Sequence, residues 1–132
     1  MNRIFILGTG HATVTRCYNT CFVLQTDTTA LLVDAGGGNG ILQRLEQAGI
    51  AIKDLHHMYV THAHTDHILG TIWVIRMVLS AAGYEGRFHV YSHAKVLRVI
   101  SMICGETLSA KHRRLMGERV VMHEVGDGTG FN

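Results

Sequence analysis

Short apolar runs that end at glycine, aspartate or threonine make up the start of the chain, a pattern typical of β-strands. Such runs lie at Ile4 to Leu7, Tyr18 to Thr26 and Ala30 to Val33. Because only Asp27-Thr28-Thr29 separates the second run from the third, these two strands are expected to form an antiparallel hairpin.

Apolar positions at helical spacing begin after the glycine-rich segment that follows Val33. Asn39 is expected to cap the first helix and Gly49 to end it. An antiparallel opening followed by alternating strands and helices predicts an α/β fold with a mixed β-sheet and flanking helices. The later strands are expected at Met58 to Val60, Phe88 to Tyr91 and Arg119 to Val125, and the later helices at Ile68 to Gly83, Ala94 to Cys104 and Ser109 to Met116.

The composition is that of one folded domain. The 132 residues include 47% hydrophobic and 17% charged residues, which excludes an intrinsically disordered chain. No proline is present and no linker marks a boundary, so we expect a single domain over residues 1–132. The formal net charge of +2 is too small to indicate a dedicated nucleic-acid-binding module.

The cysteines and the apolar segments indicate a cytoplasmic protein without a membrane anchor. An odd, low number of cysteines fits a reducing compartment, and Cys17 and Cys21 are expected to be small core residues rather than metal ligands. The start of the chain lacks the long apolar region of a signal peptide. The longest apolar stretch, Ile68 to Ala82, contains Arg76 and is shorter than the roughly 18 to 20 residues that a membrane span requires.

Residues 62–67, with the sequence His-Ala-His-Thr-Asp-His, carry four metal-ligand side chains directly after an apolar strand. On extended backbone His62 and His64 point the same way, so they can hold one ion together. Asp66 and His67 follow at the start of a helix and add oxygen and nitrogen donors for a second ion. A two-metal hydrolytic centre, with ions about 3.5 to 4 Å apart, needs such a mixed ligand set. The density of ligands favours this interpretation over a merely solvated polar loop.

The His-x-His-x-Asp-His loop at the end of a strand resembles the signature of the metallo-β-lactamase superfamily. The opening of the chain is similar to that of ribonuclease Z, the tRNA 3′-processing endonuclease, in Leu7-Gly8-Thr9-Gly10, Arg16, Asn19-Thr20 and Leu32-Val33-Asp34-Ala35-Gly36. The resemblance covers essentially all of the chain but only the N-terminal half of the superfamily's pseudo-symmetric αββα sandwich. It implies a domain truncated on its C-terminal side, with an apolar sheet face left open.

The resemblance also implies the chemistry of the loop. The residues that match His62 and His64 bind a first Zn²⁺ ion in that family, and those that match Asp66 and His67 bind a second. The aspartate at the position of Asp66 also takes part in proton transfer, and the one at Asp34 supports the metal loop. The implied function is a metal-dependent phosphodiesterase or endoribonuclease that uses metal-activated water, with precursor tRNA as a substrate. Mn²⁺ and iron suit the same donors.

Two further interpretations stay open at this point. Family members complete the site with a His, a bridging Asp and a final His, none of which this chain supplies. The chain is therefore expected to form a homo-oligomer, to be completed by a second copy or a missing C-terminal half, or to be a catalytically silent half-domain that self-associates. The same loop also serves hydrolases of lactones, thioesters or β-lactams, because the metals activate water without selecting the electrophile.

The other polar clusters of the sequence are weaker candidates. His93 and His11 either lie near the metal loop or have only capping and turn roles. Gly36 to Gly40 is expected to be a tight turn that supports Asp34 rather than a phosphate cradle. Lys111 to Arg114 either steer RNA or form a solvated helix face. No ligand-like neighbours are expected for the remaining histidines, His56, His57, His89, His112 and His123.

Overall fold

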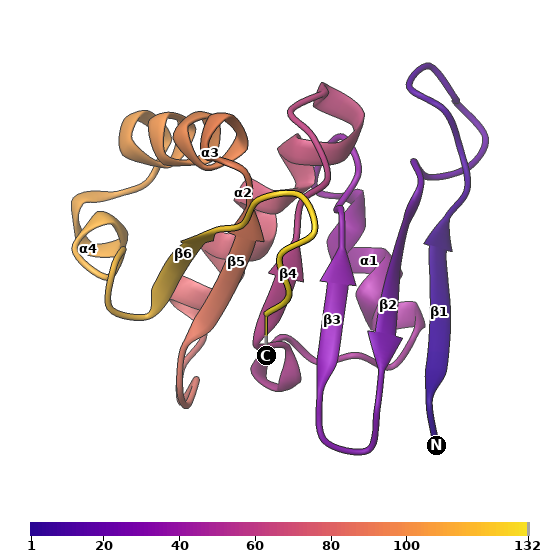
Figure 1. The fold of residues 1–132 in the computed structure, drawn as a ribbon, viewed down its shortest axis with the longest axis horizontal. Helices are drawn as coiled ribbons and strands as arrows, with labels where there is room; N and C mark the ends of the chain where they lie inside the picture. The colour runs from indigo at the N-terminus through magenta and orange to yellow at the C-terminus, as the bar shows by residue number, and fades with distance from the viewer. Residues whose placement is uncertain (132) are drawn as a thin grey trace.

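Six strands form one mixed sheet in the computed structural model, which describes residues 1–131, and they lie side by side in chain order (Figure 1). The first three strands pair antiparallel, and from the third strand onward every pairing is parallel. This confirms the predicted hairpin and the predicted mixed sheet. The strands are β1 (Arg3–Gly8), β2 (Cys21–Gln25), β3 (Ala30–Val33), β4 (His57–Tyr59), β5 (Phe88–Ser92) and β6 (Val120–Glu124).

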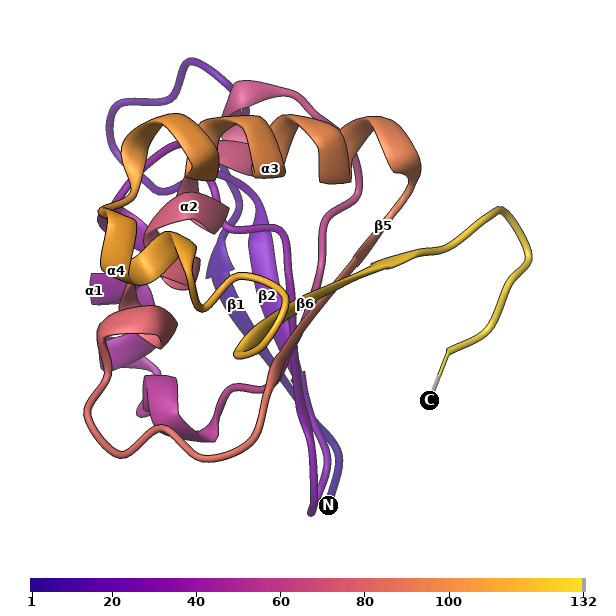
Figure 2. The ribbon, with the colours of Figure 1, turned by 90° about the vertical axis from the view of Figure 1, so that its left-hand side faces the viewer.

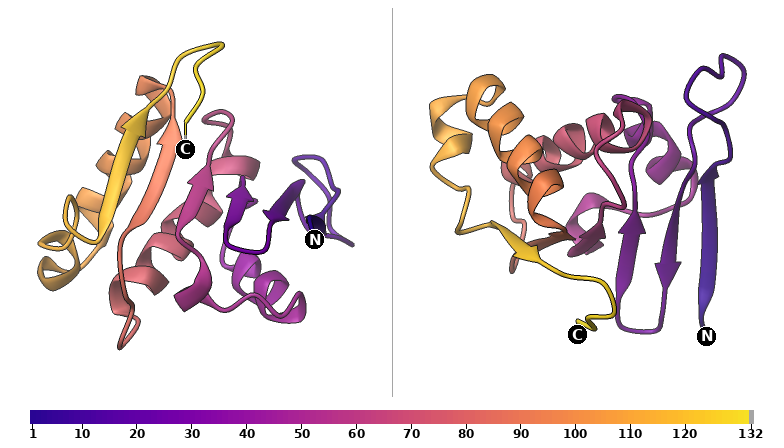
Figure 3. Two further views of the ribbon diagram at one scale, coloured as in Figure 1. Left: turned by 60° about the horizontal axis from the view of Figure 1, so that its bottom comes forward. Right: turned by 45° about the horizontal axis from the view of Figure 1, so that its top comes forward.

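All the helices lie on one face of this sheet (Figure 2). Parallel strands that follow one another in one direction are joined by right-handed crossovers, which carry every connecting helix over the same face. The helices are α1 (Gly40–Gln47), the 3₁₀ helix η1 (Ile52–Asp54), α2 (Thr65–Ser80), α3 (Ala94–Thr107) and α4 (Ala110–Arg113). Contacts join α1 to β1, α2 to both α1 and α3, and α3 to β5 and β6, an arrangement that Figure 3 shows from two directions.

The hydrophobic core lies between the sheet and the helices. Alternate residues of the strands point toward it, and Val23, Leu32 and Met58 from three neighbouring strands are completely buried. The central helix α2 contributes Val74, Ile75 and Val78, which are also completely buried. Among residues 1–131, α2 and the other helices are too short or too polar to cross a membrane.

Among residues 1–131, no helix covers the opposite face of the sheet (Figure 2). Ile4 and Ile6 leave 63% and 62% of their surface exposed there, while Phe5 between them packs against the core. The segment after β6 crosses this side of the sheet, where the Phe131 ring stacks 4.1 Å from that of Tyr91 (Figure 2). Two rows of paired residues cross the open face: Ile4, Leu24, Leu31, His57, His89 and Val121, and Ile6, Phe22, Val33, Tyr59, Tyr91 and His123.

These rows correct one expectation about the histidines. His57, His89 and His123 come from three adjacent strands, and His89 contacts both of the others, with its Nδ1 2.8 Å from His123 Nε2. The rings of His57 and His89 stack with centroids 5.4 Å apart. Burial is the main cause that lowers the pKa of both His57 and His89, which favours their neutral forms.

Other expectations are wrong in detail. The strand expected from Tyr18 begins only at Cys21, since the residues before it bend to reach the loop at Gly10. Asn39 precedes α1 without a side-chain capping bond. Cys21 is buried as expected, but Cys17 is exposed and lies outside the core.

Candidate metal centre

The ligand-rich loop leaves the carboxyl end of β4 and runs into α2. Its starting point is fixed by β5, because Val60 N–H donates to Tyr91 O at 3.1 Å and the buried Ser92 hydroxyl donates to Val60 O at 2.6 Å. The backbone is extended as far as His64, whose φ and ψ are −70° and 145°, and the helix begins at the next residue. The apolar strand and the apolar helix thus hold a polar turn of a few residues between them.

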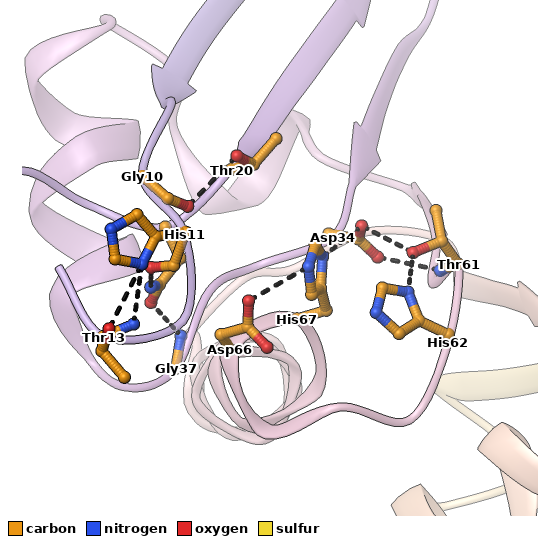
Figure 4. A network of polar contacts seen from close by, with 11 residues as sticks. Gly10, His11, Thr13, Thr20, Asp34, Gly37, Thr61, His62, Asp66 and His67 are labelled. Atoms are coloured by element: carbon orange, nitrogen blue, oxygen red, sulfur yellow. Dashed lines mark hydrogen bonds and ion pairs between the residues drawn. The ribbon is translucent and has the colours of Figure 1, made fainter.

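Asp34, at the carboxyl end of the neighbouring strand β3, organises this loop (Figure 4). It leaves only 5% of its surface exposed and has a left-handed backbone with φ of 57°, which Asp tolerates better than most residues. Its carboxylate accepts hydrogen bonds from Thr61 N and from the Thr61 hydroxyl, both at 2.8 Å. His67 Nδ1 lies 2.8 Å from the same carboxylate. One buried carboxylate therefore holds both ends of the loop.

The same contacts orient two imidazole rings. The Thr61 hydroxyl directs its own hydrogen to Asp34, so His62 Nδ1, at 2.7 Å from that oxygen, donates to it. His67 Nδ1 donates directly to Asp34. In both rings Nδ1 is therefore occupied, which leaves Nε2 as the nitrogen for a metal, the arrangement by which hydrogen-bond partners prepare histidines for metal binding.

The candidate ligands lie close together. Ring centroids are 4.6 Å apart for His62 and His64 and 4.2 Å apart for His62 and His67. Asp66 Oδ2 lies 3.2 Å from His67 Nε2. Burial first, and then the neighbouring His67 and His64, lower the pKa of His62, which favours the neutral imidazole that a metal requires. Asp66 also lies in the first turn of α2, where the helix dipole favours negative charge.

These donors suit a divalent ion in chemistry but do not close a site by themselves. Neutral imidazole nitrogens and a carboxylate oxygen are the donors that zinc takes in catalytic sites. Across residues 1–131, however, no three His, Cys, Asp or Glu side chains form a group that could hold one ion. The loop therefore offers an oriented partial ligand set, and further donors have to complete it.

The weaker candidates occupy supporting or separate places. His11 lies in the loop between β1 and β2, where Nδ1 is 3.3 Å from Thr13 N, a contact of the turn itself. His93 is exposed at the start of α3. Gly37 N donates to Asn19 Oδ1 at 2.9 Å, so the glycine segment is a turn tied to its neighbours. Lys111 lies on the short helix α4, with its side chain exposed.

Sequence reasoning missed Thr61 and Ser92, which shape the loop through the contacts given above. Thr61 stands directly before the motif, and this position is the sequence feature that could have indicated its role. Ser92 lies 32 residues from its partner Val60, so only the parallel pairing of β4 and β5 brings the two together.

Comparisons with known proteins find relatives named ribonuclease Z. Ribonuclease Z of Streptomyces avermitilis is 35% identical over 79 residues, which are 59% of this chain and 26% of that protein. Ribonuclease Z of Phocaeicola vulgatus is 25% identical over 99 residues, 74% of this chain and 31% of that protein. The chain thus spans about a quarter to a third of the length of these relatives.

Solved structures support the fold. The short form of human tRNase Z superposes with a TM-score of 0.74 at 21% identity, over 94% of this chain and 44% of that one. A diphosphatase from the PhnP family gives a TM-score of 0.70 at 20% identity, over 96% of this chain and 51% of that one. The metallo-β-lactamase-fold protein YhfI of Bacillus subtilis gives a TM-score of 0.70 at 17% identity, over 100% of this chain and 49% of that one. The mixed sheet with its helices therefore has the fold of about half of a metallo-β-lactamase-fold protein, and the resemblance to ribonuclease Z is confirmed. A family model described as "Anti-Pycsar protein Apyc1" matches residues 2–115, so the chain belongs to the Anti-Pycsar Apyc1 family.

Proposed function

We propose that the chain provides the first half of a two-metal hydrolase site that cleaves phosphodiesters. The observation that carries this proposal is the network around Asp34, which occupies Nδ1 of His62 and of His67, so that Nε2 is the nitrogen left to bind a metal on a loop that also carries His64 and Asp66. A solvated loop has no need of a buried carboxylate that fixes ring nitrogens, whereas a metal site depends on one.

In this proposal His62 and His64 hold one ion, and Asp66 and His67 hold the second. Zinc is the expected metal, and manganese and iron suit the same donors. A bound divalent ion would lower the pKa of water far enough to supply hydroxide at neutral pH and would stabilise negative charge on phosphate oxygens. Asp66 would accept a proton at Oδ2, which lies 3.2 Å from His67 Nε2. Asp34 and Thr61 hold the rings of His62 and His67 in fixed orientations.

The substrate of this proposed site is either an RNA or a smaller phosphate ester. The relatives named ribonuclease Z favour RNA, including precursor tRNA, and Lys111, Arg113 and Arg114 form an exposed basic group that would attract it. The family description names an anti-Pycsar protein, and the PhnP-family neighbour is a diphosphatase, so a smaller phosphate ester is the alternative. Both share the phosphorus centre, which is the part of the proposal that the metal loop supports.

Completion of the site is part of the same proposal. The donors that the loop lacks are expected from a second copy or from a C-terminal half laid on the open face, where Ile4 and Ile6 are exposed. The rival candidate is a silent half-domain that self-associates through this face without turnover. The absence of a three-donor group among residues 1–131 is what favours it.

The test combines metal content, mass in solution and hydrolysis on protein purified without chelator. We expect hydrolysis of bis(p-nitrophenyl) phosphate and none of lactones, together with close to two metal ions per chain in an associated form. An RNA with a precursor-tRNA end, assayed beside the small diester, separates the two substrate sizes. His64→Ala is expected to abolish turnover, whereas His112→Ala, on α4, serves as the matched control. Hydrolysis of lactones alone, or a metal-free associated chain without turnover, would overturn the proposal in favour of one of its rivals.

A further inference from the structure

Tyr18 lies outside the proposed ligand set but is tightly fitted against the turn that carries Asp34. Its hydroxyl shares its hydrogen between two backbone carbonyls, Ala35 O at 2.6 Å and Gly38 O at 3.0 Å. Its ring fills the space where Gly36 and Gly40 have no side chain, since a Cβ built on them would lie 2.3 Å and 2.7 Å from ring carbons. Because the ring fills this space so closely, the turn can take only one position relative to the ring.

The opposite side of the same turn rests on helix α2. Gly70 N donates to Gly36 O at 2.8 Å, and a Cβ on Gly70 would lie 1.9 Å from Ala35 O. Ala35 N donates to His67 O at 3.2 Å. The turn that follows Asp34 is therefore clamped between the Tyr18 ring and the first turns of the helix that begins at the metal loop.

We propose that Tyr18 is a positioning residue for the metal loop, which fixes Asp34 and, through Asp34 and Thr61, the orientation of the His62 ring. The sequence of contacts is continuous: Tyr18 to Ala35, the adjacent Asp34 carboxylate to the Thr61 hydroxyl, and that hydroxyl to His62 Nδ1. Asp34 has a left-handed backbone with φ of 57°, and the carbonyl that accepts from Tyr18 belongs to the next residue, Ala35. The inference deepens the proposed function and concerns the same site.

The hydroxyl is suited to a permanent structural role. Burial raises the pKa of Tyr18 to about 12, so the hydroxyl keeps its hydrogen over the whole range in which the proposed chemistry operates. Tyr84 provides a matched comparison away from the site. Its hydroxyl donates to Leu55 O at 2.7 Å, and burial likewise raises its pKa to about 12.

The test compares Tyr18→Phe with Tyr84→Phe in the full chain. Each variant loses one tyrosine hydroxyl and keeps its ring, and each is expected to lower the thermal midpoint by roughly 5 °C. At pH 8, nitrogen NMR of the imidazoles reports which ring nitrogen of His62 carries the hydrogen. We expect Nδ1 alone in the natural chain and in Tyr84→Phe, and a mixture of both tautomers in Tyr18→Phe. Zinc affinity, measured against a chromogenic chelator, is expected to fall about tenfold in Tyr18→Phe only.

Gly40→Ala gives an independent second variant, since its Cβ would displace the Tyr18 ring while the hydroxyl remains. It is expected to mix the His62 tautomers as Tyr18→Phe does. An unchanged His62 tautomer in both variants, or the same mixture in Tyr84→Phe, would overturn the inference. The tautomer measurement needs no metal and no turnover, so failure of the proposed function would leave this inference standing.

Discussion

Replacement of Asp34 by asparagine tests the network at its centre. Asparagine has nearly the same shape and tolerates the left-handed backbone at φ of 57° as aspartate does, so the backbone is not strained by the change. The carboxylate accepts three hydrogen bonds, two on Oδ2 from the Thr61 hydroxyl and His67 Nδ1, and one on Oδ1 from Thr61 N. An amide has one acceptor oxygen, so at least one of these donors must lose its partner.

The magnitude follows from the best placement of the amide. With its oxygen at the Oδ2 position the amide keeps two bonds, and its NH₂ group then opposes Thr61 N–H. A hydrogen bond to a charged group contributes about 1.5 to 3 kcal/mol, and a buried donor left unpaired costs about 1 to 3 kcal/mol. Because these two costs overlap, Asp34→Asn is expected to lower the free energy of unfolding by about 2 to 4 kcal/mol.

The assay is equilibrium urea unfolding followed by circular dichroism, with chelator present so that metal binding does not alter the apparent stability. Asp127→Asn, at an exposed position after β6, is the charge-matched control, with an expected change within about 0.5 kcal/mol. If Asp34→Asn changes the free energy of unfolding no more than this control does, the carboxylate does not organise the loop. The argument for an oriented His62 would then fail with it.

Three further predictions concern separate parts of the molecule. His64→Ala is expected to remove most of the bound metal, as measured by elemental analysis, while His112→Ala keeps it; an unchanged metal content would exclude His64 as a ligand. The double substitution Ile4→Lys with Ile6→Lys is expected to leave folding almost unchanged, because both side chains are more than 60% exposed, and to lower the mass in sedimentation equilibrium. A mass unchanged by these lysines would show that the open face is not the contact between copies. Tyr84 has its pKa raised from 10.0 to about 12, so its neutral form stabilises the fold below pH 10 and this contribution is lost as the pH rises to about 12. Urea midpoints should therefore fall more steeply in that range for the natural chain than for Tyr84→Phe, and parallel curves would contradict this.

Much of the fold could be predicted because its elements are local. The apolar run before residue 61 and the apolar helix after residue 67 predict the turn between them, and this is where the loop lies. The sequence predicts a strand from Tyr18, whereas β2 begins at Cys21, because the Tyr18 ring serves another purpose. Tyr18 packs its ring against a glycine turn that lies about 20 residues later in the chain, and no local pattern distinguishes such a residue from a strand residue.

The contacts that position the site depend on sheet order, which local sequence patterns do not contain. Ser92 meets Val60 only because β5 pairs with β4 in parallel register. The same holds for His57, His89 and His123, which are far apart in sequence and adjacent across three strands. A residue's neighbours across a sheet follow from register, so local sequence patterns predict no neighbours for these histidines.

The sheet supports two physically independent properties, an oriented ligand loop and an uncovered apolar face. Contacts at the carboxyl ends of β3, β4 and β5 hold the loop. Asp34 binds it from one side and Ser92 from the other, and both belong to this chain. The folded chain is stabilised when another surface covers apolar residues of the open face such as Ile4, since burial contributes about 25 cal/mol for each Å² of apolar surface. A covering surface therefore raises stability and adds the donors it carries, while the orientation of His62 stays as this chain sets it. For that reason the His62 tautomer is expected to be the same in the free and the associated chain, whereas metal affinity is expected to increase with association.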